Sequence, residues 1–321
     1  MRKILARSLI SLFFIALLFW CVKEDIPRIL QVLRNINRPL LTGAVIIFVA
    51  TVFIMAKRLE MVFKAEEIPI KFTDVSNLSF VGFFFNNFLP TSVGGDIVKA
   101  LCAARVTGEP VKSVTSVLMD RIFGLFTFIM IPSFSLLFFV KEIQDPRVPV
   151  LVYSFLACSL FFFFLLFNRN IARRFKFIEV FLNYFKLGAK VRKIYDGLHK
   201  FKNHKMLIVK ALFLSVAGQS LNIFVLYLMA VAMGVQASLT NLFYFFLLVP
   251  VVHLISMVPS LNGLGVREWA YIQFLTPHFG REYAAAIGVL WLALLFLLSL
   301  IGGVIYFLRH DYHIRFKEIA K

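Results

Sequence analysis

The sequence predicts an all-α integral membrane protein, a polytopic helical bundle with about six full spans plus two inverted re-entrant helical hairpins. The 321-residue chain is 60% hydrophobic and only 16% charged, and its mean hydropathy of +0.84 is far above that of soluble domains. Long apolar runs recur along it, and no low-complexity tract or Gly/Ser linker divides it. We therefore expect residues 1–321 to form a single transmembrane domain.

Seven apolar runs approach the roughly 20 residues that a spanning helix requires. They cover residues 4–22, 39–56, 122–140, 148–167, 206–233, 242–259 and 284–308. The first run has basic residues at its start, as a signal peptide does, but no small-residue cleavage site follows it. We interpret this run as a retained membrane anchor.

The distribution of charge predicts the orientation of these spans. The net charge is +18, and the basic loop at residues 168–205 holds 11 basic and 2 acidic residues. By the positive-inside rule this loop is cytoplasmic, and so are both termini, which also carry basic residues. Its aromatic residues suit an interfacial helix on anionic headgroups, so no binding of nucleic acid is expected. The predicted location is the cytoplasmic (inner) cell membrane.

Counting spans from both ends leaves two segments that must start and end on the same side of the membrane. They are residues 76–105, with both ends cytoplasmic, and residues 242–275, with both ends outside. Limbs such as 78–89 and 97–105 are too short to span as helices at ~1.5 Å per residue. We therefore predict two re-entrant hairpins, whose unwound backbone must be buried in protein or line water.

The two hairpins share a sequence pattern at their predicted tips. FLPTSVGGDIVKA at 88–100 and MVPSLNGLGVREWA at 257–270 both run from an apolar residue to Pro, Ser or Thr, two glycines and a charged helix start. Because the two tips enter from opposite faces, they form an inverted pair. Interrupted segments at matching positions of two halves point to a transport site.

Each tip carries two glycines, Gly94 and Gly95 in the first and Gly263 and Gly265 in the second. We expect these glycines to turn the chain with positive φ and to leave backbone amides free for a ligand. The helix that begins near Asp96 presents its positive end there and favours an anion. Asp96 itself is either a helix cap or a site residue, and its position suits both roles.

Five further charged residues are candidate ligands for an anionic headgroup: Lys99, Asp120, Arg121, Arg267 and Glu268. Lys99 lies one turn after Asp96 and can pair with it or share a phosphate. The planar guanidinium of Arg267 can bind two phosphate oxygens at once. Arg121 either snorkels to the inner interface or has an internal partner, and the aspartate beside it favours an internal partner.

Other polar residues in the apolar runs are interpreted as packing residues. Cys21, Cys102 and Cys158 lie far apart in or beside these runs, so neither a disulfide nor a metal site is implied. His253 is interpreted as a buried neutral histidine bonded to a neighbouring helix rather than as a proton relay.

These motifs carry a resemblance to a known family. LPTSVGGDIVKALCAARVTG, SVLMDRIFGL and PSLNGLGVRE resemble the lysylphosphatidylglycerol synthase transmembrane-region family of flippase-like proteins, over essentially the whole chain. The resemblance implies two inverted hairpins around a lipid-headgroup cavity. It assigns to that cavity the motif residues Gly94, Gly95, Asp96, Asp120, Arg121, Gly265, Arg267 and Glu268. Lys99 stands where the family often has arginine, and without a soluble synthase domain no synthesis of lysyl-lipid is expected.

The leading hypothesis is a lipid flippase-like transporter, not an enzyme, that moves an anionic phospholipid or a polyprenyl-phosphate-linked lipid between leaflets. Its expected partners are membrane lipids, no cofactor or metal is expected, and homo-oligomer formation is left open. One alternative is a membrane-embedded transferase or hydrolase for a lipid-linked sugar, with Asp96, Asp120 and Glu268 as its candidate carboxylates. Another is a non-catalytic regulator that docks a partner through the basic loop.

Overall fold

The computed structural model describes residues 26–88, 94–139, 147–167, 195–199, 201–257 and 263–312, and all regular structure in these ranges is helical. In chain order the elements are α2 (Ile26–Arg34), α3 (Arg38–Ala65), α4 (Phe72–Phe88), α5 (Gly94–Thr107), α6 (Pro110–Phe139), α7 (Arg147–Phe167), η2 (Phe201–Asn203), α11 (Lys205–Ala232), α12 (Leu239–Ile255), α13 (Val266–Phe279), α14 (Arg281–Leu308) and η3 (His310–Tyr312). The predicted all-α class is confirmed.

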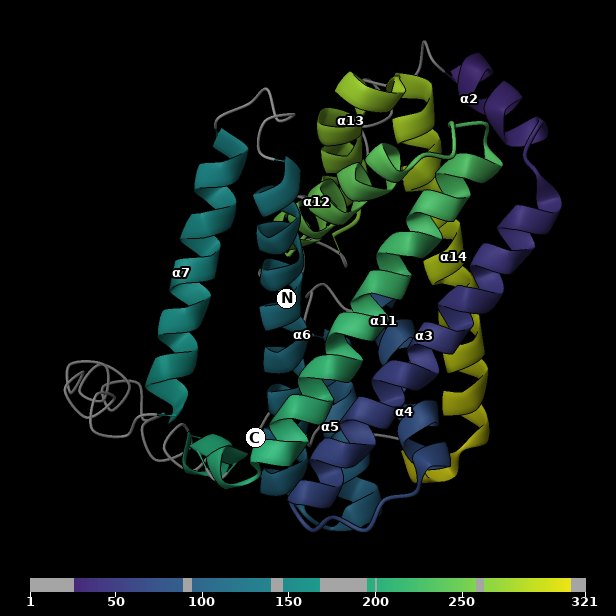
Figure 1. The fold of residues 1–321 in the computed structure, drawn as a ribbon. Helices are drawn as coiled ribbons and strands as arrows, with labels where there is room; N and C mark the ends of the chain where they lie inside the picture. Colours follow the sequence, from purple (N-terminus) through teal and green to yellow (C-terminus); the bar gives the residue numbers. More distant parts are fainter. Residues whose placement is uncertain are drawn as a thin grey trace, which may run out of the picture.

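Four of the described helices, α3, α6, α11 and α14, are long and apolar enough to cross a membrane. They contain 28 to 30 residues each and run side by side through the height of the molecule (Figure 1). Large apolar side chains such as Phe134, Phe213 and Leu300 point outward from them, as expected of a surface that faces lipid. The predicted run 148–167 forms α7, whereas the run 4–22 and most of the basic loop lie outside the described residues.

Local chemistry explains where several of these helices begin. The Asn37 side-chain oxygen accepts a hydrogen bond from the Leu40 amide at 3.2 Å and caps α3. Ser238 caps α12 in the same way by accepting from the Asn241 amide at 3.1 Å. Gly280 makes the turn between α13 and α14. Its φ angle of +87° is one that residues with a side chain rarely adopt.

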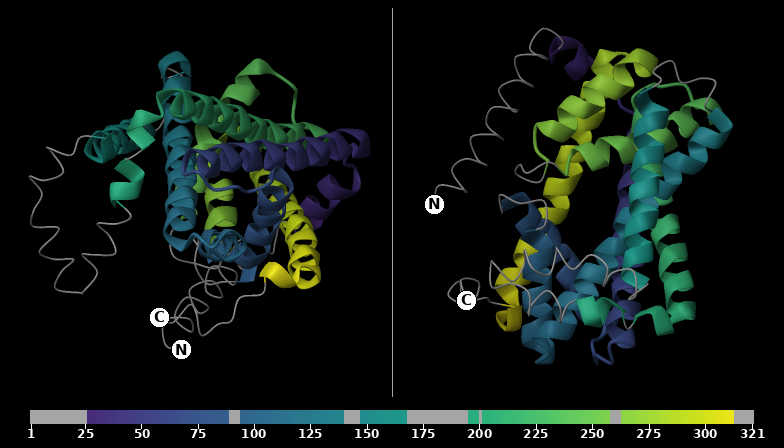
Figure 2. Two further views of the ribbon diagram at one scale, coloured as in Figure 1. Left: turned by 90° about the horizontal axis from the view of Figure 1, so that it is seen from below. Right: turned by 90° about the vertical axis from the view of Figure 1, so that its left-hand side faces the viewer.

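Two helical hairpins occupy opposite ends of the bundle. The pair α4 and α5 lies at the lower end of Figure 1 and the pair α12 and α13 at the upper end, and Figure 2 shows the same separation. Both pairs consist of a 17-residue helix followed by a 14-residue helix. At a rise of 1.5 Å per residue these limbs are ~25 and ~21 Å long, which is less than the ~30 Å hydrocarbon core.

The two limbs of the first hairpin approach each other closely at Gly82 and Gly95. A Cβ atom on Gly95 would overlap the Gly82 carbonyl oxygen and would lie 2.6 Å from Oδ1 of Asn86. The prediction of a positive φ at Gly95 is therefore wrong, because this residue lies inside α5 and serves close packing instead. Gly263 and Gly265 do have positive φ angles, +74° and +81°, as predicted.

Each hairpin is held between long helices. α4 packs on α14 and α5 on α6, while α12 packs on α6 and α13 on α14. Separate apolar clusters surround the two hairpins, one that includes Tyr271 and Trp291 and one that includes Leu59 and Leu78. Residues near the facing ends of these limbs, namely Asn86, Asp96, Leu254 and Arg267, line one cavity, which is the candidate site.

Candidate functional site

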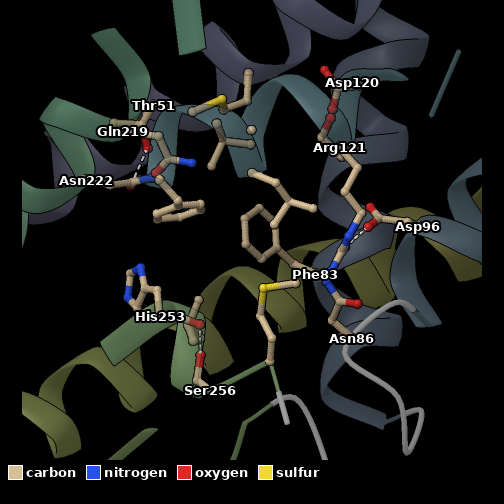
Figure 3. Close-up of a pocket in the computed structure, with 18 of the residues that line it drawn as sticks. Thr51, Phe83, Asn86, Asp96, Asp120, Arg121, Gln219, Asn222, His253 and Ser256 are labelled. Atoms are coloured by element: carbon tan, nitrogen blue, oxygen red, sulfur yellow. Dashed lines mark hydrogen bonds and ion pairs between the residues drawn. The ribbon is translucent and has the colours of Figure 1, made fainter. Parts of the chain in front are cut away.

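A cavity of about 360 Å³ lies where the two hairpins meet the four long helices, and all eight of these helices contribute to its wall. Figure 3 shows its polar side chains converging from helices that are far apart in the sequence. Five of the residues predicted as ligands line it, namely Asp96, Lys99, Asp120, Arg121 and Arg267. The fold thus brings the charges of both hairpins and of α6 to one place.

The first group of charges connects α5 to α6. Asp96, in the first turn of α5, accepts a hydrogen bond from Nζ of Lys99 at 3.2 Å and forms an ion pair with Arg121 of α6. The three side chains are 15 to 24% exposed, so a ligand in the cavity can reach them. The Asp96 carboxylate thus bonds to two basic side chains. Arg121 therefore has an internal partner, as the aspartate beside it indicated. The alternative role of Asp96 as a helix cap would use the amide of residue 93, which lies outside the described residues.

A second ion pair connects α3 to α6, and of its two residues the sequence analysis predicted Asp120 but not Arg58. The Arg58 guanidinium donates to both carboxylate oxygens of Asp120, at 2.6 and 2.9 Å, and to the Ser215 hydroxyl at 2.7 Å. Arg58 is 5% exposed and Asp120 is 8% exposed. In the sequence Arg58 follows Lys57 at the end of an apolar run, where both read as topology signals. Its spacing of seven residues from Thr51 places the two on one helix face, and this pattern would have indicated an inward role.

A third ion pair lies at the start of α13. The Arg267 guanidinium donates to Oε1 of Glu268 at 2.7 and 3.0 Å. The other carboxylate oxygen of Glu268 accepts from the Gly265 amide at 2.6 Å, which fixes the glycine turn against the helix. Glu268 thus holds Arg267 in place from a position that is not on the cavity wall.

The remaining predicted residues position the site rather than line it. The Gly95 amide donates to Oδ1 of Asn86 at 2.8 Å, and the Gly265 amide donates to Glu268. The predicted free amides are therefore wrong for these two glycines, because side chains already satisfy them. Gly94 starts α5, and Gly263 packs closely against Ser256.

The opposite wall of the cavity is polar but uncharged (Figure 3). Thr51 of α3 donates to the side-chain oxygen of Asn222 on α11 at 3.1 Å. Gln219 lies one turn before Asn222, is 6% exposed, and its side-chain oxygen has no hydrogen-bond partner among the described residues. Nε2 of His253 lies 3.1 Å from the Tyr271 hydroxyl of α13, which confirms the predicted bond to a neighbouring helix, although His253 is only partly buried. Sequence reasoning did not assign this wall to the site.

The cavity wall carries an excess of positive charge. Its charged members are Arg58, Lys99, Arg121, Arg267, Asp96 and Asp120. With Glu268 included, these are four basic groups against three acidic ones. Because charges interact more strongly in a protein interior than in water, this excess favours an anionic ligand.

A bundle of long apolar helices around a cavity lined by charged residues is typical of a multi-pass membrane protein. The family model of the lysylphosphatidylglycerol synthase TM region matches residues 4–303, and the chain therefore belongs to this family. No curated protein and no solved structure gives a significant match to the chain. The resemblance of its motifs to this family is thus confirmed over nearly the whole chain.

Proposed function

We propose that the protein is a lipid flippase-like transporter that moves an anionic phospholipid or a polyprenyl-phosphate-linked lipid between the two leaflets. The observation that carries the proposal is the positively charged cavity at the meeting point of two opposed helical hairpins. A phosphate is the anion that arginine forks and a lysine ammonium bind best in such a site. The acyl or prenyl chains would remain in the bilayer.

Exchange of ion-pair partners gives a route for the headgroup to bind. Lys99 and Arg121 share the Asp96 carboxylate on a partly exposed part of the wall, where an entering phosphate competes for both cations. The Arg58 and Asp120 pair is buried and stays intact, so it fixes the position of α6. When the lipid leaves, the Asp96 carboxylate pairs with both cations again, and the empty site keeps its shape.

The two hairpins supply access from opposite sides in this proposal. Their limbs are too short to span as helices, and their equal lengths fit an inverted pair. We propose that each tip is re-entrant and that both termini and the basic loop at 168–205 are cytoplasmic, as the positive-inside rule predicts. Each carboxylate of the transferase or hydrolase alternative is held by a basic side chain, and we propose no catalysed reaction.

The proposal is tested by lipid exchange in proteoliposomes. Purified protein is reconstituted with acyl-labelled anionic and zwitterionic lipids, and movement between leaflets is followed by quenching of the label from outside. Wild-type protein should accelerate exchange of anionic lipids, and Lys99→Gln should slow it by about tenfold, since a hydrogen bond to a charged group contributes ~1.5–3 kcal/mol.

Lys112→Gln is the matched control for this experiment. Lys112 pairs with Glu109 at a spacing of three residues, as Lys99 does with Asp96, but on an exposed part of α6. This variant should exchange lipids at the wild-type rate. Absence of any acceleration by the wild-type protein, or equal rates in the two lysine variants, contradicts the proposed function.

A further inference from the structure

The cavity has two chemically different walls. Figure 3 shows Arg121 and Asp96 on one side and Gln219, Asn222 and His253 on the other. The first side carries the ion pair between Asp96 and Arg121, whereas the labelled residues of the second side offer amide, hydroxyl and imidazole groups without formal charge. A bare phosphate would use only the first side. The second side needs an explanation of its own.

The uncharged wall has unused hydrogen-bonding capacity. Gln219 is more than nine-tenths buried and faces the cavity, yet its side-chain oxygen has no partner among the described residues. A buried amide oxygen without a partner costs ~1–3 kcal/mol, so such a group usually marks a place where a ligand or water binds. Asn222 accepts from Thr51 through its oxygen, and this leaves its amide nitrogen oriented to donate to a ligand.

Aromatic side chains line the same cavity as these amides. Trp291 lies 5.8 Å from His253 and 5.0 Å from Phe48, measured between ring centroids, and all three residues line the cavity. A few placed polar groups beside aromatic surfaces are the usual lining of a small-molecule site. The combination suits a group with hydroxyls to bond and C–H faces to pack, as glycerol and sugars have.

We infer that the uncharged wall, with Gln219 at its centre, binds a neutral polyhydroxyl part of the lipid headgroup, while the phosphate lies against the basic wall. This inference rests on the proposed function and names its substrate class: a phosphate-linked glycerol, inositol or single sugar. The volume of about 360 Å³ is at the small end of the ~300–1,000 Å³ range of ligand sites, which suits one such unit.

The same charges disfavour a cationic headgroup. A lysyl group carries ammonium charges that require a carboxylate partner in a buried site. Asp96, Asp120 and Glu268 are each engaged by arginine or lysine, and the wall already has an excess of positive charge. The Gln219 side of the cavity presents no carboxylate among its described lining residues. An aminoacylated lipid is therefore a poorer fit than its unmodified polyol lipid.

The test compares four lipids with the same labelled acyl chains in proteoliposomes of the full chain. They are phosphatidylglycerol, phosphatidylinositol, phosphatidic acid and lysylphosphatidylglycerol. We expect the two polyol lipids to exchange faster than the other two. Gln219→Leu should lower the ratio of phosphatidylglycerol to phosphatidic acid exchange by about three- to tenfold, the equivalent of one neutral hydrogen bond. Gln273→Leu, an exposed glutamine on α13, serves as the control and should leave the ratio unchanged.

A second variant keeps the test valid if Gln219→Leu does not fold. Gln219→Glu retains the size of the side chain and adds a carboxylate, so it should shift the preference toward lysylphosphatidylglycerol. Equal exchange of phosphatidylglycerol and phosphatidic acid by wild type, a wild-type preference for the lysyl lipid, or a ratio that neither variant moves overturns the inference and leaves the proposed function standing. No exchange of any of the four lipids contradicts the proposed function itself.

Discussion

Replacing Asp120 with asparagine removes the charge that holds Arg58 inside the bundle, and we expect it to destabilise the protein by about 3–5 kcal/mol. The asparagine keeps one oxygen that can accept from the guanidinium, but one of the two charged hydrogen bonds, at 2.6 and 2.9 Å, is lost. That bond alone contributes ~1.5–3 kcal/mol. The rest comes from a cation that is 5% exposed and has lost its counter-charge.

The assay is unfolding in detergent micelles by a denaturant, followed by tryptophan fluorescence. Glu109→Gln is the control, because Glu109 and Lys112 form an exposed pair at 3.6 Å that should contribute at most ~1 kcal/mol. A double variant, Arg58→Met with Asp120→Leu, should recover most of the lost stability, since it leaves no buried charge of this pair without a partner. If Asp120→Asn is no more destabilised than Glu109→Gln, the reasoning about this pair is refuted.

Three further predictions use the same preparations. Gly95→Ala should destabilise by about 1–3 kcal/mol because its Cβ overlaps the Gly82 carbonyl, whereas Gly43→Ala, with no atom within 4 Å, should be neutral or stabilising; equal unfolding midpoints would contradict this. Gly265→Ala should cost about 1 kcal/mol through its φ of +81°, and an unchanged midpoint would show that the turn adapts. Finally, an anionic lipid at about 100 times its Kd should stabilise wild type by ~2.7 kcal/mol, and Arg121→Gln should lose most of this gain in a thermal shift assay.

Sequence reasoning located the charged parts of the site because polar residues are costly inside a membrane and therefore conspicuous there. Asp96, Lys99, Asp120, Arg121 and Arg267 all reach one cavity, although they come from segments up to 171 positions apart in the chain. The limbs of the first hairpin, at 72–88 and 94–107, are longer than the predicted limbs at 78–89 and 97–105. Helix continues through polar residues once its backbone hydrogen bonds are made, so hydropathy underestimates its length.

The residues that were missed share a different property. Arg58 was not predicted because it follows Lys57, and the pair resembles a topology signal. Successive helix positions are ~100° apart, however, and only Arg58 points inward. Gln219 and Asn222 sit inside an apolar run at a spacing of three residues, which places them on one face. Whether these two residues line a cavity depends on which face of α11 packs against the other helices. Because α11 is hydrophobic all round, its sequence does not indicate which face that is.

Two adjacent residues of α6 bind different neighbours, and this has a mechanical consequence. Asp120 connects α6 to α3 through a buried pair, whereas Arg121 connects it to α5 through a pair that faces the cavity. A ligand that takes Arg121 from Asp96 would loosen α5 and leave α3 and α6 as a rigid frame. In the second hairpin the corresponding pair, Arg267 with Glu268, lies within α13 itself and does not link two helices. The two hairpins are thus equal in helix length but differ in how they are held, because in the first an ion pair between two helices faces the cavity and in the second the ion pair lies within one helix.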